Sequence, residues 1–137
     1  MAPVEQCPSC GAKGMTAFSD REMPISCKHI TKFVSGLNGH ECFECKEVVF
    51  SDSDDSVIRY SEAGDAAVYE YRASELLRIR KKLGLTQIEM VRRVTGGGHN
   101  AVSRYEKGEV RIPTPLWMLL KQLDKRPEML DELDASV

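Results

Sequence analysis

Hydrophobic and polar positions follow different periods in the two halves of the chain. Residues 27–34 alternate between apolar and polar side chains and include β-branched residues, a pattern typical of a half-buried strand. The segment Leu37-Asn38-Gly39 favours a turn before a second extended segment at 40–42. The N-terminal half is therefore predicted to form a small antiparallel sheet.

Helical periodicity replaces this alternation in the C-terminal half. Leu76, Ile79 and Leu83 recur at helical spacing after a predicted start at Ser74, and Gly84 stops this first helix. A capping box over Thr86–Glu89 predicts the start of the second helix, and the turn at Gly96–Gly98 separates it from a third helix over 99–107. Thr114 is predicted to cap a fourth helix that starts at Pro115, and Pro127 is predicted to start a fifth.

The segment between the halves is predicted to be helical but interrupted. Ser and Asp residues at 51–56 favour a helix start, because their side chains accept hydrogen bonds from the first backbone N–H groups. Residues 57–69 are compatible with a helix that Gly64 interrupts. We expect one or two helical pieces as the connection between two domains, residues 1–70 and 71–137.

Two Cys-x-x-Cys pairs carry the strongest chemical signal. Cys7 and Cys10 form the first pair, Cys42 and Cys45 form the second, and 31 residues separate the pairs. Two such turns bring four thiolates around one tetrahedral ion, the arrangement of structural Zn²⁺ sites. We expect one structural zinc ion per chain, which supplies much of the folding free energy of this short domain.

Other roles for the cysteines fit the sequence less well than zinc binding. A redox Cys-x-x-Cys needs one pair in a βαβ context, which this segment lacks. Cys27 is expected to be a free or buried thiol, and His29 and His40 ordinary sheet residues, since the paired cysteines leave no ligand position vacant. A closed four-sulfur shell also leaves no position for a reactive water, so we do not expect an enzyme.

Composition and charge narrow the class of protein. The 137 residues are 42% apolar and 29% charged, without an apolar run long enough to span a membrane. The first ten residues lack the features of a secretory signal, so we expect a cytoplasmic protein with no membrane partner. Residues 1–71 carry 6 Lys and Arg against 12 Asp and Glu, whereas residues 72–126 carry 13 against 5, which suits a polyanionic partner for the second half.

Two short helices around the glycine turn, flanked by three more, indicate a helix-turn-helix DNA-binding domain. Asn100 and Arg104 lie four residues apart on the leading face of the second helix of the pair, where they can address adenine and guanine. Three further side chains are placed to meet phosphates: Gln87, Ser103 and Lys107.

Two other interpretations of these residues exist. Asn100 and Arg104 could be solvated side chains on an ordinary helical domain. The glycine turn could suggest a phosphate-binding loop, but no strand precedes it and no Gly-Lys-Ser/Thr ending follows it.

The order of these motifs resembles the MqsA (YgiT-type zinc finger) family of antitoxins. The resemblance lies in the two cysteine pairs and in the stretches 80–87 and 96–108. Leu83-x-Leu-Thr-Gln and Ser103-Arg-Tyr-Glu-x-Gly alone would match the wider XRE helix-turn-helix group. The two cysteine pairs ahead of them make the match specific.

This resemblance implies an α+β protein in which a small zinc-bound β domain is joined by a helical linker to an all-α XRE-type helix-turn-helix domain of about five helices. It implies that the first domain binds an mRNA-cleaving ribonuclease toxin, and that the second dimerises and binds a palindromic operator through Asn100 and Arg104. The function expected is an antitoxin that represses its own operon. The alternative is a free-standing helix-turn-helix regulator without a toxin partner.

A homodimer through the C-terminal domain is expected from its apolar residues as well. The fourth predicted helix offers more apolar surface than one small domain buries: Leu116, Trp117, Leu119, Leu120 and Leu123. The alternative for Trp117 is a role as a core anchor.

Overall fold

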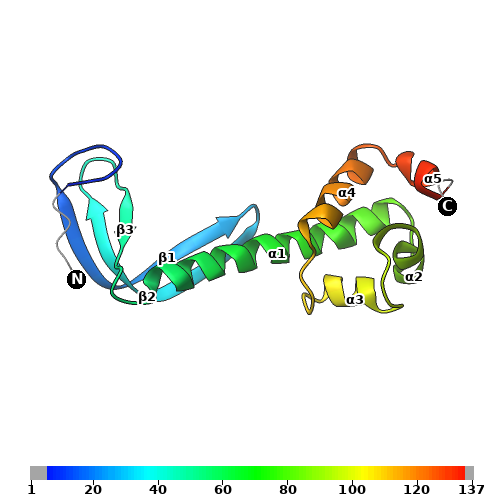
Figure 1. The fold of residues 1–137 in the computed structure, drawn as a ribbon, viewed down its shortest axis with the longest axis horizontal. Helices are drawn as coiled ribbons and strands as arrows, with labels where there is room; N and C mark the ends of the chain where they lie inside the picture. Colours follow the sequence, from blue (N-terminus) through cyan, green and yellow to red (C-terminus); the bar gives the residue numbers. More distant parts are fainter. Residues whose placement is uncertain (1–5, 135–137) are drawn as a thin grey trace. The chain divides into compact units, whose positions relative to one another are not determined.

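The computed structural model describes residues 6–134, and the chain divides into two compact units. One unit ends at Ala67 and contains a three-stranded antiparallel sheet, and the other begins at Val68 and is helical (Figure 1). The predicted α+β class is therefore confirmed. Within the described residues, no helix is both long enough and apolar enough to cross a membrane.

The sheet consists of β1 (Met15–Cys27), β2 (Ile30–Cys42) and β3 (Val48–Phe50), in that order. The hairpin turn between β1 and β2 lies at Lys28–His29, where Lys28 adopts a left-handed φ of 55°. The predicted strand over 27–34 is therefore confirmed for residues 30–34, which lie in β2, and wrong at 28–29, where the chain reverses. The predicted turn at Leu37–Gly39 is wrong too, since these residues lie within β2.

Gly39 lies where β2 and β3 pack closely, and not in a turn as predicted. It pairs with Phe50 of β3, and a Cβ atom on Gly39 would lie 2.4 Å from the carbonyl oxygen of Val49. Glycine is thus required because the β3 backbone approaches too closely for any side chain. The neighbouring Leu37 is fully buried and forms a small core with Phe18 and Val34.

Helix α1 (Ser56–Lys82) is continuous over 27 residues. The predicted interruption at Gly64 is wrong: Gly64 lies against β1, where a Cβ atom would be 2.8 Å from Cδ1 of Ile25. The predicted start at Ser74 is also wrong, because Ser74 lies within the helix and its hydroxyl donates to the carbonyl of Tyr71. No proline interrupts residues 56–82, so the backbone hydrogen bonds continue through both positions.

The predicted helix start at 51–56 is confirmed. The Asp54 carboxylate accepts a 2.8 Å hydrogen bond from the backbone N–H of Ser56, the first residue of α1. Asn38 of β2 holds this start in place: its backbone N–H donates to the Ser56 hydroxyl and its side-chain amide donates to Asp54. The first turn of α1 is thereby fixed to the middle of the sheet.

The helical unit contains the end of α1 and four further short α-helices. These are α2 (Gln87–Met90), which continues as a π-helical turn at Val91–Thr95, α3 (Ala101–Glu106), α4 (Thr114–Lys125) and α5 (Met129–Asp134). They enclose one core of ten buried residues: Leu76, Ile79, Leu85, Met90, Val91, Val102, Ile112, Leu120, Leu123 and Leu130.

The helix starts predicted from capping residues agree with the structure at Thr86 but not at Thr114. The predicted capping box is present, with the Thr86 hydroxyl accepting from the Glu89 N–H and the Glu89 carboxylate accepting from the Thr86 N–H. The predicted cap at Thr114 is off by one residue, since Pro113 caps α4 and Thr114 begins it. The Thr114 hydroxyl instead accepts from the Arg72 guanidinium.

A Gly39→Ala substitution should destabilise the sheet unit by about 1–3 kcal/mol, because the added methyl group overlaps the β3 backbone. Gly64→Ala is the matched control: its methyl meets only the end of a flexible side chain, and alanine favours the helix by about 1 kcal/mol. Urea unfolding monitored by hydrogen exchange of sheet amides checks both. Equal stabilities of the two variants would contradict this account of Gly39.

Candidate metal centre and nucleic-acid interface

The two cysteine pairs lie in two turns with the same backbone geometry. In each turn the N–H four residues after the first cysteine donates back to its carbonyl: Gly11 to Cys7 and Lys46 to Cys42, both at 3.0 Å. Gly11 and Lys46 both adopt a left-handed φ, 79° and 67°. Gly11 makes the first turn predictable from the sequence, because glycine readily adopts a left-handed φ. Lys46 gives no such indication for the second turn.

A second pair of matching hydrogen bonds closes these turns. The N–H of Cys7 donates to the carbonyl of Ala12, and the N–H of Cys42 donates to that of Glu47, both at 2.8 Å. The first turn precedes β1, and the second connects β2 to β3. The fold therefore presents two equivalent hairpin-like turns to each other.

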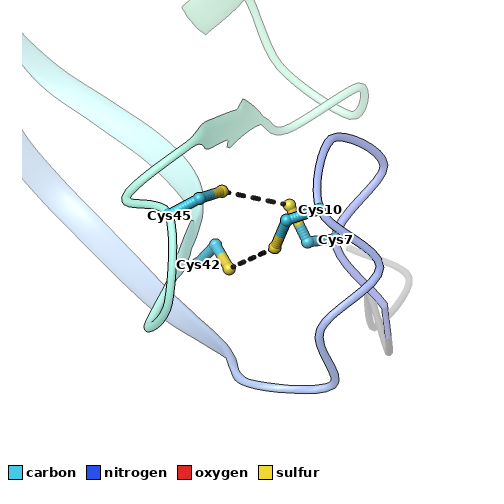
Figure 2. Close-up of side chains that lie close together, drawn as sticks. All are labelled: Cys7, Cys10, Cys42 and Cys45. Carbon is cyan, nitrogen blue, oxygen red and sulfur yellow. Dashed lines mark hydrogen bonds between the residues drawn. The ribbon is translucent and has the colours of Figure 1, made fainter.

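The four sulfur atoms converge on one point (Figure 2). All lie within 4.8 Å of one another, and the Cys7–Cys45 and Cys10–Cys42 sulfur pairs are each 3.6 Å apart. Tetrahedral metal–sulfur bonds of about 2.3 Å place sulfur atoms about 3.8 Å apart, so the spacing fits a four-sulfur shell. These cysteines thus form a candidate metal centre, as their spacing predicted.

Electrostatics in the cluster favour a bound cation. Backbone hydrogen bonds, chiefly at Cys10, lower the pKa of the Cys7 thiol to about 7. At Cys45 a backbone hydrogen bond from Glu47 also lowers the pKa, but desolvation and the three neighbouring thiols outweigh it and raise the pKa to about 12. The sulfurs therefore cannot all carry negative charge unless a cation lies among them.

The remaining candidate ligands lie outside this cluster. Cys27 ends β1 and is partly exposed, while His40 is buried in β2 opposite Ala17 and Val49. His29 lies in the hairpin turn and not in a strand as expected.

The predicted base-contacting residues lie at the start of α3 and one turn into it. Asn100 caps α3 through its backbone, whose carbonyl accepts from the Arg104 N–H, and its exposed side chain makes no capping hydrogen bond. The Arg104 side chain is half exposed, 3.6 Å from the carboxylate of Glu109. Ser103 is half-buried, and Lys107 is exposed at the end of the helix.

Gln87 differs from these residues because its side chain is already engaged. Its amide donates a 2.8 Å hydrogen bond to Glu106 of α3, and the same carboxylate accepts a 2.6 Å hydrogen bond from Arg80 of α1. Glu106 and Arg80 are only 9% and 14% exposed. Sequence reasoning missed this network, whose three members join three helices and lie far apart in the chain.

The comparisons with known proteins agree with this arrangement. Residues 5–134 match the family described as the antitoxin component of bacterial toxin-antitoxin systems, MqsA. The chain is also 33% identical to Antitoxin MqsA of Escherichia coli (strain K12), over 93% of this chain and 98% of that protein. The family match spans both the cysteine cluster and the helical unit.

We predict one metal ion per chain, bound by the four clustered cysteines. Cys10→Ser should abolish stoichiometric metal binding and loosen the sheet unit, because three sulfurs no longer close the shell. Cys27→Ser is the matched control, since Cys27 lies outside the cluster, and should keep one ion. Elemental analysis of protein purified without chelator measures both. Equal metal content in the two variants would show that the cluster is not the binding site.

Proposed function

The chain belongs to the MqsA family, the antitoxin component of bacterial toxin-antitoxin systems, and we propose that it neutralises an mRNA-cleaving toxin and represses its own operon. The observation that carries the proposal is the family match, which extends over both the cysteine cluster and the helical unit. We assign toxin binding to the N-terminal unit and DNA binding to the C-terminal unit. Family membership implies a regulatory protein and not a catalyst.

We propose that the metal is a single structural Zn²⁺ ion. Four thiolates in a tetrahedral arrangement are a donor set that Zn²⁺ prefers. The residues that would hold it are Cys7, Cys10, Cys42 and Cys45, and the ion would neutralise part of their charge. All four positions of such a shell are taken by protein sulfur, so its contribution is stability.

For DNA binding we propose an XRE-type helix-turn-helix formed by α2, the Gly96–Gly98 turn and α3. Asn100 makes no capping hydrogen bond with its exposed side chain, and Arg104 forms only a solvent-exposed ion pair with Glu109, which supports their role in reading base edges. Ser103, Lys107 and the second amide hydrogen of Gln87 would meet phosphates. A protein that binds an operator and a toxin acts in the bacterial cytoplasm.

We propose that a homodimer forms through the outer side of α4. Leu120 and Leu123 are fully buried in the core of the helical unit, so they are not available for the dimer contact predicted for them. Leu116 and Leu119 are only partly buried, and Met118 is 51% exposed. Trp117 packs against the core and edge-on to Tyr71, in keeping with its alternative role as an anchor.

The toxin hypothesis is tested with the product of the gene adjacent to this one. Coexpression should yield a stable complex, and the purified full-length chain should suppress mRNA cleavage by that product at equimolar ratio. A chain that binds operator DNA but neither binds nor inhibits the neighbouring product would be the free-standing regulator instead.

Two variants separate reading of bases from binding of phosphates. Arg104→Ala should weaken operator binding by about 1–3 kcal/mol and flatten the preference at one base position, because a bidentate donor is lost. Lys107→Ala should weaken operator and random DNA alike and lower the salt slope by about one, because one fewer counterion is released.

The measurement is a salt-titrated binding series for both variants on operator and random DNA. The proposed docking of α3 is wrong if Arg104→Ala weakens both DNAs equally while Lys107→Ala changes the base preference.

A further inference from the structure

The N-terminal part of α1, residues 56–67, has two distinct faces. One face packs on the sheet: Tyr60 donates a hydrogen bond to the carbonyl of Pro24 and contacts the ring of Phe50, and Gly64 lies against Ile25. The opposite face consists of exposed residues that we call the outer stripe: Val57, Ile58, Ser61, Glu62 and Asp65. Their spacing of one, four, five and eight residues places them on one side of a helix.

Two branched aliphatic side chains at the head of the outer stripe are exposed to solvent. Val57 is 48% exposed and Ile58 is 59% exposed. Both residue types also have lower helix propensity than the polar residues common on helix surfaces. Neither the fold of this unit nor the stability of α1 accounts for two such residues in succession, which points to a role in binding.

The outer stripe is negatively charged as well. Neither Glu62 nor Asp65 has an ion-pair partner within the described residues, and the nearby Arg59 is engaged by Asp55 and by the carbonyls of 35 and 36. The unit up to Ala67 carries 6 Lys and Arg against 11 Asp and Glu, a net charge of −5. A partner that covers this face therefore needs a basic surface.

The other large exposed apolar residues of the unit lie beside lysine residues. Phe33 is 67% exposed but follows Lys32 near the hairpin turn at Lys28. Phe43 is 69% exposed, with the Lys46 ammonium 5.1 Å from its ring centroid. Of these surfaces, the outer stripe combines exposed aliphatic groups with carboxylates that no cation neutralises.

We propose that the outer stripe of α1 is the docking face for the basic toxin, with Val57 and Ile58 as the apolar centre and Glu62 and Asp65 as the charged rim. The inference rests on the proposed function, which supplies a partner that cleaves RNA and so binds a polyanion. An apolar centre within a polar rim is the usual composition of a specific protein interface. The charged rim would speed association with the basic toxin, and burial of the apolar centre would slow dissociation.

The test uses full-length chain and the purified product of the adjacent gene. Val57→Ser with Ile58→Ser should weaken the complex about 10- to 100-fold, mainly through faster dissociation. Glu62→Lys with Asp65→Lys should slow association about tenfold at low salt and reduce its dependence on ionic strength. These side chains are exposed, so circular dichroism and metal content should match those of the unchanged protein.

Two controls match these variants. Phe33→Ser removes an apolar group of the same unit that is more exposed than Val57 or Ile58. Glu128→Lys with Glu132→Lys makes the same change in net charge as the stripe variant, but in α5 and just before it. Both should bind the toxin as the unchanged protein does. If the stripe variants bind the toxin normally, the inference is wrong while the proposed function stands. The same holds if a stripe variant changes the oligomeric state and not toxin binding, because the outer stripe would then contact a second copy of this chain. Failure of the unchanged protein to bind the adjacent product overturns the proposed function, and the inference with it.

Discussion

The crowding of four thiols at one point is the constraint on which the N-terminal unit depends. The buried core cluster that the structure describes there consists of Phe18, Val34 and Leu37, compared with ten residues in the helical unit. So small a core contributes little to stability. Four thiols within 4.8 Å of one another suit a bound cation, and binding of that cation would add to the stability of this unit.

The cysteine cluster also determines the position of the outer stripe. Cys42 ends β2, so its position fixes the strand that contains Asn38, and Asn38 holds Ser56 and Asp54 at the start of α1. Two links therefore connect Cys42 to the first turn of α1: the backbone of β2 and the hydrogen bonds of Asn38. The start of the proposed toxin surface is thus hydrogen-bonded to a strand that ends at Cys42 of the candidate metal centre.

Features decided by neighbouring residues could be predicted from the sequence, and features decided by distant contacts could not. The cysteine spacing and the Thr86–Glu89 capping box were predicted because each forms within one turn of chain. Gly39 and Gly64 were misinterpreted as breakers, because their role is to admit Val49 and Ile25, which come from other strands. The hairpin turn was missed since Lys28 carries no local turn signal and only strand pairing gives it a left-handed φ.

In the helical unit a buried hydrogen-bond network orients the proposed DNA-reading residues. Its Glu106 carboxylate is 9% exposed and is shared between Arg80 of α1 and Gln87 of α2. A carboxylate so deeply buried is stable only while both donors reach it, so the angle between α3 and the two other helices is restricted. Asn100 caps the start of the same short helix and Arg104 lies two residues before Glu106, so the direction of both side chains follows from where Glu106 is held. In both units a buried polar group with several partners, and not the apolar core alone, determines where the exposed binding residues point.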